Sequence, residues 1–287
     1  MVYRQVAMRV GTITHAFQKP TIEDIAESVK ASGIRSVQLD LASAGMESLP
    51  ESLDGGACRR IREAFDVRGI EVAALMTTFN AIHPDRGIRY DHIARAIRMI
   101  ERCGDLGTPV AALCTGTRDT ESMWRTHPAN SKPEAWRDLI ETLEQLLPAA
   151  EACGVKLGIE PEPNNVVDSA GKAHRLLDEM RSPNLGIVMD GANLFGFDER
   201  RSMRDVLNEG FDLLGARIIL AHAKDLSDDP SDPYPAVGTG KLDWDTYFDR
   251  LGACGFEGAV IMHNLSESQV PACVAFVQEH IRRSRHE

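Results

Sequence analysis

The chain has 287 residues, of which 43% are hydrophobic and 26% charged, a composition typical of a globular protein with a sizeable core and not of a disordered chain. The formal net charge of −11 repels polyanions, which excludes nucleic acid and anionic membrane surfaces as expected partners. No run of about 20 apolar residues and no signal-peptide pattern is found, so we expect a cytoplasmic protein without a membrane span.

Short β-forming runs alternate with amphipathic stretches along the whole chain. In the intervening stretches apolar residues recur three and four positions apart, which predicts helices. Several of these helices are expected to end in a glycine, because glycine readily adopts the left-handed backbone that closes a helix; these are Gly33, Gly69, Gly107, Gly154 and Gly255. The eight predicted strands span residues 8–13, 34–41, 70–77, 108–115, 155–160, 185–190, 216–223 and 258–263.

This alternation predicts an α/β fold with parallel strands that are buried on both faces. Eight such units close most naturally into a single (β/α)8 TIM barrel, and we expect it to occupy residues 1–287 as one domain. An open, doubly wound sheet is the alternative, but no G-x-G-x-x-G motif follows the first strand. The longest loops are expected at residues 116–133 and 225–243.

Each of the last four predicted strands ends in a side chain that can bind a metal ion. In TIM barrels the chemistry lies at the carboxyl ends of the strands. Two carboxylates and two imidazoles there suit one divalent cation, such as Mn2+, Zn2+, Co2+ or Fe2+. Taken singly, each residue could equally be a helix cap or an ion-pair partner. The predicted ligands are Glu160, Asp190, His222 and His263.

The sequences at these strand ends resemble the xylose isomerase-like TIM barrel superfamily. The motifs that carry the resemblance are GIEPE (158–162), GIVMDGAN (186–193), AHAKD (221–225), GTGKLDW (238–244) and GFEGAVIMH (255–263). The superfamily includes sugar and sugar-phosphate isomerases, ketose 3-epimerases, inositol-pathway dehydratases and an apurinic endonuclease branch. The resemblance spans nearly the whole chain and implies a metal-dependent enzyme of carbohydrate metabolism.

In the epimerase-like members, a Glu, an Asp, a His and a Glu after strands five to eight hold the metal. The resemblance therefore implies that Glu160, Asp190 and His222 are ligands, whereas His263 stands where glutamate is usual. The two glutamates of those epimerases transfer protons on opposite faces of the substrate. A metal-bound histidine is a poorer base, because its lone pair is already used.

Glu162 is a candidate to carry protons in place of the missing glutamate. If the strand stays extended beyond Glu160, residues 160 and 162 point to the same side, so Glu162 would face the cavity. A salt bridge to Lys224 or Arg118 is the structural alternative. The resemblance also places Asn193 where related epimerases often have a substrate-contacting histidine, and asparagine can still bind a sugar hydroxyl.

Lys224 lies two residues beyond the predicted ligand His222. Its ammonium group could stabilise negative charge on the substrate beside the metal, so we predict a catalytic role for Lys224 together with Glu160 and Glu162. An ion pair with Asp225 or Glu162 explains the lysine equally well.

The loops after the earlier strands supply candidates for substrate contact. An aromatic ring beside hydroxyl, amide and guanidinium groups is a common way to hold a sugar. Alternatively, these side chains satisfy one another within the loops. The candidates are Asn80, His83, Thr117, Arg118 and Trp124, with His15 after the first strand as a weaker one.

Taken together, the sequence predicts a divalent-metal-dependent sugar, sugar-phosphate or keto-sugar isomerase or epimerase. The expected reaction moves a proton next to a carbonyl through a metal-stabilised enediolate. A dehydratase or lyase of the same superfamily is the first alternative and a non-catalytic sugar-binding barrel the second. The expected partner is a small carbohydrate, and barrels of this superfamily commonly form dimers or tetramers.

Overall fold

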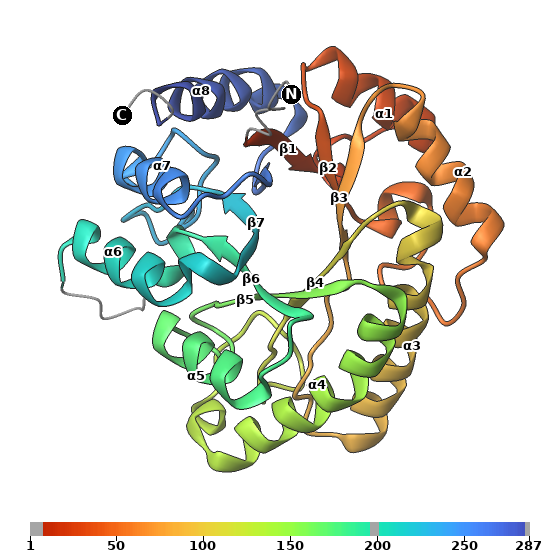
Figure 1. Cartoon of the computed structure of the whole chain (residues 1–287), viewed down its shortest axis with the longest axis vertical. Helices are drawn as coiled ribbons and strands as arrows, with labels where there is room; N and C mark the ends of the chain where they lie inside the picture. The colour runs from red at the N-terminus through yellow and green to blue at the C-terminus, as the bar shows by residue number, and fades with distance from the viewer. Residues whose placement is uncertain (1–7, 196–200, 285–287) are drawn as a thin grey trace, which may run out of the picture.

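A closed barrel of eight parallel strands forms the centre of the molecule (Figure 1). The computed structural model describes residues 8–195 and 201–284. The strands follow one another around the ring in chain order, and β1 closes the ring by pairing with β8. They are β1 (Arg9–Ile13), β2 (Ser36–Leu39), β3 (Glu71–Met76), β4 (Val110–Cys114), β5 (Lys156–Glu160), β6 (Leu185–Asp190), β7 (Ile218–Ala223) and β8 (Ala259–Met262).

Eight α-helices of the described residues surround the strands (Figure 1). The predicted (β/α)8 barrel is therefore confirmed and the open doubly wound sheet is wrong, because the pairing of β1 with β8 leaves no free edge. The helices are α1 (Ile22–Ala31), α2 (Gly55–Asp66), α3 (Arg86–Leu106), α4 (Pro133–Cys153), α5 (Ala170–Met180), α6 (Met203–Leu214), α7 (Trp244–Ala253) and α8 (Val270–Arg283).

The predicted boundaries are accurate to within a few residues. The five glycines expected to close helices all have φ between 65° and 75°, in the left-handed region. The seventh strand begins at Ile218 rather than at residue 216, because residues Gly215–Arg217 form a 3-10 turn (η5). The eighth strand ends at Met262, so His263 is the first residue beyond it.

The apolar core has two parts that together decide where polar groups can lie. The larger part lies between strands and helices, and a smaller cluster fills the barrel interior. Within the barrel the space is tight: a Cβ atom on Gly186 would lie 2.7 Å from the side chain of Ile219. The interior cluster comprises Ile13, Ala74, Val110, Ala112, Val188, Leu220, Ala259 and Ile261. Because apolar side chains fill the middle of the barrel, polar groups lie at its two ends: Arg9, Ser36 and Glu71 bond one another at the amino ends of β1 to β3, and the predicted ligands lie at the carboxyl ends of β5 to β8.

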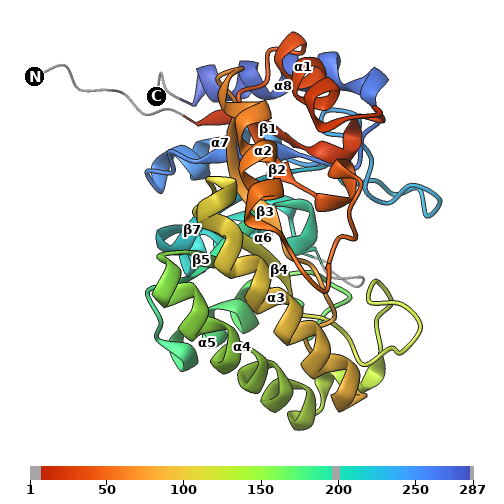
Figure 2. The same ribbon diagram turned by 90° about the vertical axis from the view of Figure 1, so that its right-hand side faces the viewer.

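Two long loops follow β4 and β7, as predicted for residues 116–133 and 225–243. The first contains only the 3-10 turn Pro128–Ser131 (η3), and the second has no helix or strand. Both project from the same side of the barrel (Figure 2). No helix in the described ranges is both long and apolar enough to cross a membrane.

The buried carboxylate of Asp225 organises the loop after β7. Its side chain is fully buried and accepts four hydrogen bonds of 2.8–2.9 Å, three from backbone N–H groups and one from the indole Nε1 of Trp244. The backbone donors are Leu226, Gly238 and Leu242. The motif GTGKLDW thus serves to wrap this loop around one carboxylate.

Candidate metal centre and substrate cavity

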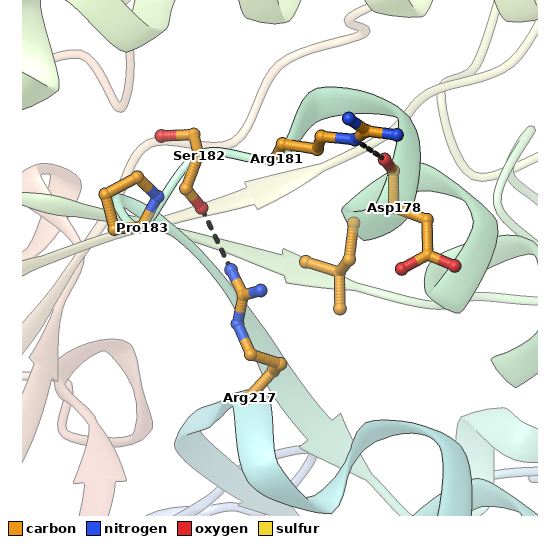
Figure 3. A pocket seen from close by; sticks show the side chains of 6 residues that line it. Asp178, Arg181, Ser182, Pro183 and Arg217 are labelled. Atoms are coloured by element: carbon orange, nitrogen blue, oxygen red, sulfur yellow. Dashed lines mark hydrogen bonds between the residues drawn. The ribbon is translucent and has the colours of Figure 1, made fainter.

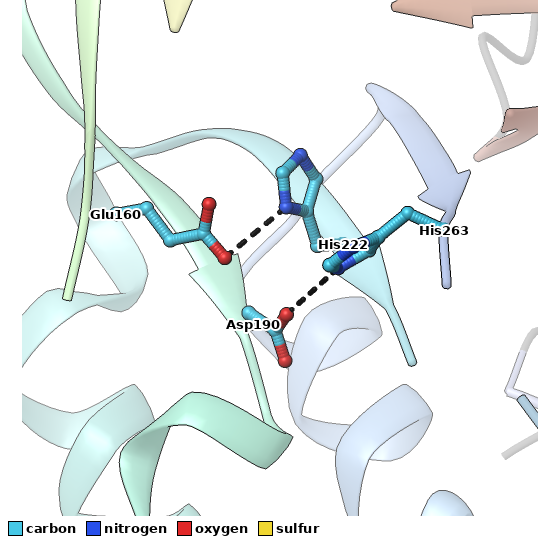
Figure 4. Close-up of side chains that lie close together, drawn as sticks. All are labelled: Glu160, Asp190, His222 and His263. Carbon is cyan, nitrogen blue, oxygen red and sulfur yellow. Dashed lines mark hydrogen bonds and ion pairs between the residues drawn. The ribbon is translucent and has the colours of Figure 1, made fainter. Parts of the chain in front are cut away.

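The four predicted ligands lie together at the carboxyl ends of β5 to β8 (Figure 4). Their candidate ligand atoms are all within 4.8 Å of one another. Asp190 Oδ2 lies 3.0 Å from His263 Nε2, and Glu160 Oε1 lies 3.2 Å from His222 Nδ1. The side chains are 0–13% exposed. The barrel therefore brings two carboxylates and two imidazoles from four neighbouring strands to one point.

This donor set fits a divalent ion. Ligand atoms about 2.1 Å from one ion, at right angles, lie about 3.0 Å apart, close to the two spacings between the carboxylate and imidazole atoms. Mixed oxygen and nitrogen ligands suit Zn2+, Mn2+, Co2+ and Fe2+. Burial also lowers the pKa of His263, which favours the neutral imidazole that a metal requires.

Asp190 is the most buried member of the cluster. Burial alone would raise the pKa of its carboxyl, but the Lys224 ammonium and the hydrogen bond to His263 outweigh this and lower it. Oδ1 also accepts hydrogen bonds from the backbone N–H groups of Ala192 (2.9 Å) and Asn193 (3.3 Å). These contacts hold the carboxylate in its charged form, with Oδ2 directed at His263.

Gln38, on β2, orients the imidazole of His222 from across the barrel. Gln38 Oε1 lies 2.8 Å from His222 Nε2. With Nε2 as the donor to this amide oxygen, Nδ1 keeps its lone pair on the side of Glu160, where a metal would bind. The hydroxyl of Tyr247 lies 2.8 Å from the carbonyl oxygen of His222 and 2.9 Å from that of Met189, and its one proton is shared between them. The sequence alone gave no signal for Gln38.

Lys224 is buried beside the cluster. Its Nζ lies 3.4 Å from Asp190 Oδ2 and donates to Asn193 Oδ1 at 2.6 Å. Although burial disfavours an ammonium group, the negative charges on Asp190, Glu160 and Glu162 raise the pKa of Lys224. Among the described residues, its ion pair is thus with Asp190 rather than with the expected alternatives Asp225 or Glu162.

Asn193 connects Lys224 with Glu160, the first of the predicted ligands. Its Nδ2 donates to Glu160 Oε1 at 2.8 Å, while its Oδ1 accepts from Lys224. Tyr234, from the loop after β7, covers Lys224 with its ring centroid 4.4 Å from Nζ. Sequence reasoning missed Tyr234, because the loop carries no motif that places this side chain over the barrel.

Glu162 is buried on the β5 side of the cavity. Cys114 Sγ donates to its Oε1 at 2.8 Å, and Asn165 Nδ2 donates to its Oε2 at 3.3 Å. Burial and the nearby charge on Glu160 raise the pKa of Glu162 to about 7. In the described residues Arg118 pairs with Asp138 at 2.7 Å, so the predicted alternative of a bridge from Glu162 to Arg118 does not form.

A cavity of about 330 Å³ opens above the cluster. This volume is at the lower end of the range of roughly 300–1,000 Å³ for small-molecule sites and suits a monosaccharide-sized ligand. The candidates that line it are Glu160, Glu162, Asn193, His222, Lys224, His263, Trp124 and His15. Residues not anticipated from the sequence also line it, namely Ile13, Gln38, Met76, Thr78, Cys114, Pro163, Asn164, Tyr234 and Asn264.

Four of the predicted substrate contacts do not line this cavity. Asn80 is buried and bonds the next loop, accepting from Thr117 N (3.0 Å) and donating to Thr117 O (2.9 Å). The Thr117 hydroxyl donates to Arg125 O, Arg118 pairs with Asp138, and His83 Nδ1 accepts from a backbone N–H in its own loop. The structure therefore places these four side chains where they brace the loops after β3 and β4.

A second hollow, of about 530 Å³, lies at the amino ends of β6 and β7, and Figure 3 shows the side chains that line it. It is lined by residues at the end of α5 and before β6 and β7, including Arg181, Ser182 and Arg217. Arg217 donates to Ser182 O at 2.9 Å, and Arg181 Nε donates to Asp178 O at 3.2 Å. Its two arginines thus bind backbone carbonyls, and no metal-ligand cluster lies there among the described residues.

Comparison with known proteins identifies relatives of the same fold. A ketose 3-epimerase of Arthrobacter globiformis is 30% identical over 106 residues, which cover 37% of this chain and 32% of that protein. A D-tagatose 3-epimerase-like protein superposes with a TM-score of 0.76 at 15% identity, covering 97% of this chain and 98% of its own. The IolI protein, solved with a bound zinc atom, superposes with a TM-score of 0.75 at 18% identity, covering 98% of this chain and 100% of its own.

The match to the curated epimerase spans about a third of that protein's length, and the solved structures share the fold. A family model described as xylose isomerase-like TIM barrel matches residues 26–275, which is most of the chain. The chain belongs to the xylose isomerase-like TIM barrel family.

Proposed function

We propose that the protein is a metal-dependent isomerase or epimerase that acts on a monosaccharide-sized ketose or keto-sugar. The observation that carries the proposal is the position of the buried carboxyl of Glu162 in the same cavity as the four-residue cluster. The ketose 3-epimerase relative supports the class of substrate. A divalent ion held by Glu160, Asp190, His222 and His263 would supply Lewis-acid stabilisation of negative charge on the substrate oxygens.

In this proposal Glu162 removes the proton next to the carbonyl. With its pKa raised to about 7, the carboxyl is suited to accept and return a proton near neutral pH. The thiol of Cys114 and the amide of Asn165 fix both carboxylate oxygens, so the side chain has one orientation.

Lys224 and Asn193 would bind the substrate oxygens in this proposal. The ammonium group of Lys224 lies in the cavity wall and can stabilise the charge that develops on an enediolate oxygen. Asn193 can donate to or accept from a sugar hydroxyl. Because Asn80, His83, Thr117 and Arg118 lie outside the cavity, we assign them a role in shaping the loops, and Trp124 remains the proposed aromatic contact.

The test is incorporation of deuterium from D2O into sugars, measured by mass spectrometry after incubation with Mn2+-loaded protein. Substituting Glu162→Gln is expected to slow exchange into the epimer whose C–H bond faces Glu162 by about 10²- to 10⁴-fold, the usual contribution of a general base. Metal content should stay unchanged, because Glu162 is outside the four-residue cluster.

The matched control is Glu121→Gln, in the loop after β4, whose side chain is 76% exposed and forms an ion pair with Arg125. It is expected to leave exchange unchanged. Undiminished exchange by Glu162→Gln into every sugar that the wild type exchanges would remove Glu162 from proton transfer. No exchange into any keto or aldo sugar with the metal-loaded wild type would favour a non-catalytic binding barrel instead.

A further inference from the structure

His15 and Asp40 form an imidazole–carboxylate pair at the mouth of the cavity. His15 lies in the 3-10 turn η1 (Thr14–Ala16) directly after β1, and Asp40 caps the turn η2 (Leu41–Ala44) directly after β2. His15 Nδ1 is 3.2 Å from Asp40 Oδ2, and the His15 side chain lines the same cavity as Glu162. Neither residue belongs to the four-residue cluster.

The carboxylate of Asp40 is buried and fixed by hydrogen bonds. Its side chain is 9% exposed, and Oδ1 accepts hydrogen bonds from Ala42 N (3.0 Å) and the Ser48 hydroxyl (3.1 Å). The backbone N–H of Asp40 donates to the Thr14 hydroxyl at 3.0 Å, which ties the two turns together. Burial would raise the pKa of Asp40, but its hydrogen bonds, including that from His15, outweigh burial and lower it.

This arrangement determines which nitrogen of the His15 imidazole is free to transfer a proton. With Nδ1–H donating to the carboxylate, Nε2 is the nitrogen that accepts or delivers a proton. The described residues provide no hydrogen-bond partner for Nε2, and the side chain, which lines the cavity, is 46% exposed. The geometry is that of a base oriented by a third group, since the buried acid fixes the ring and the other nitrogen stays available.

The barrel topology places this pair opposite Glu162. β1 and β5 are four positions apart in a closed ring of eight strands, so residues at their carboxyl ends face each other across the cavity. Figure 1 shows the two strands on opposite sides of the ring. The cluster residues occupy the ends of β5 to β8, and among the described cavity-lining residues on or after β1 to β3, His15 is the one with an acid–base side chain.

We propose that His15 is the second acid–base group of the enzyme and Asp40 its positioning residue, so that the protein inverts a carbon centre and does not merely exchange its proton. This inference rests on the proposed function. Glu162 would take the proton of the substrate C–H bond, whose electron pair passes into the enediolate. The His15 imidazolium would then deliver its Nε2 proton to the opposite face of the same carbon. Solvent water restores both groups, leaving the Glu162 carboxylate and the His15 imidazolium.

The test measures two rates in D2O, the incorporation of deuterium into each epimer and the interconversion of the two epimers. It uses the pair of C3-epimeric ketohexoses that the Mn2+-loaded wild type interconverts fastest. His15→Gln is expected to slow interconversion by about 10²- to 10⁴-fold. It should still exchange the proton of the epimer whose C–H bond faces Glu162, within about threefold of the wild-type rate, and lose exchange of the other epimer. Glu162→Gln should show the reverse selectivity.

Asp40→Asn tests the positioning role, because asparagine can still accept the Ala42 N–H while it no longer holds the Nδ1–H tautomer. It is expected to slow interconversion by about tenfold or more, with the same selectivity between epimers as His15→Gln. The matched control is His174→Gln, which removes the exposed His174–Asp178 pair on α5 and should change neither exchange nor interconversion.

Two results would overturn the proposal. One is unchanged interconversion in His15→Gln, and the other is an equal loss of exchange from both epimers at unaltered metal content and unfolding midpoint. If the wild type exchanges one position but interconverts no epimers, His15 is not a second base while the proposed proton transfer stands. If the wild type exchanges no sugar at all, the proposed function fails and this inference fails with it.

Discussion

Replacing Asp190 by asparagine is expected to reduce the metal content from roughly one ion per chain to a small fraction of that value. The carboxylate is the most buried of the four proposed ligands, and Asn cannot supply a negatively charged oxygen. Loss of an outer-shell partner already costs about 10- to 100-fold in metal affinity or activity, so loss of this ligand should cost more than about 100-fold. Elemental analysis of protein purified without chelator measures the content directly.

The substitution has a second expected effect on Lys224. The ammonium group would lose its ion-pair partner inside the protein, where an unpaired charge is costly. The free energy of unfolding should therefore fall by about 3 kcal/mol or more. Chelator should lower the thermal midpoint of the wild type and leave that of Asp190→Asn unchanged, because only a protein that holds metal can lose it.

Glu162→Gln serves as the control for metal binding, since Glu162 shares the cavity but lies outside the cluster. Equal metal content in Asp190→Asn and the wild type would contradict the assigned site. It would also remove the basis for the Lewis-acid part of the proposed function.

Replacing Asp225 by alanine is expected to have the largest effect on stability. The change would leave three backbone N–H groups and the Trp244 indole N–H without their buried acceptor. Each buried donor left unpaired costs about 1–3 kcal/mol, and relaxation of the loop toward water will recover part of this. We expect the free energy of unfolding to fall by about 4 kcal/mol, measured by urea denaturation.

Hydrogen exchange should rise across residues 225–243, which include Tyr234 and therefore part of the cavity wall. The control is Asp228→Ala in the same loop, whose carboxylate is 86% exposed and pairs with Lys241 at the surface. It should change the free energy of unfolding by less than about 1 kcal/mol. Similar losses in the two variants would mean that the loop does not depend on the Asp225 carboxylate.

The order of helices and strands could be predicted because the spacing of apolar residues and the glycines that end helices can be recognised within a short stretch of sequence. The positive φ of Gly107 and Gly154 follows from each closing a helix, and no distant contact is needed to recognise it. The predicted start of β7 is two residues too early, because Ala216 and Arg217 belong to the 3-10 turn Gly215–Arg217, which leads directly into the strand.

The candidate ligands could be predicted because parallel strands in a barrel all end at one rim. This rule needs only the position of each strand end in the sequence, so Glu160, Asp190, His222 and His263 were identified together. The substrate contacts were harder, since a polar residue in a loop can point to the cavity or into the loop. The Asn80 side chain forms hydrogen bonds with the backbone of Thr117 in the next loop, whereas Trp124 lines the cavity.

By itself the sequence determined the barrel and the polar residues that end its last four strands. Only the tertiary structure decided which partners those residues have, because pairing across the barrel depends on side chains far apart in the chain. Gln38 meets His222 from 184 positions away, Asp40 orients His15, and Lys224 pairs with Asp190 instead of its sequence neighbour Asp225. The physical reason is that local patterns set backbone conformation, while hydrogen bonds and ion pairs form only where the closed fold brings groups within about 3 Å.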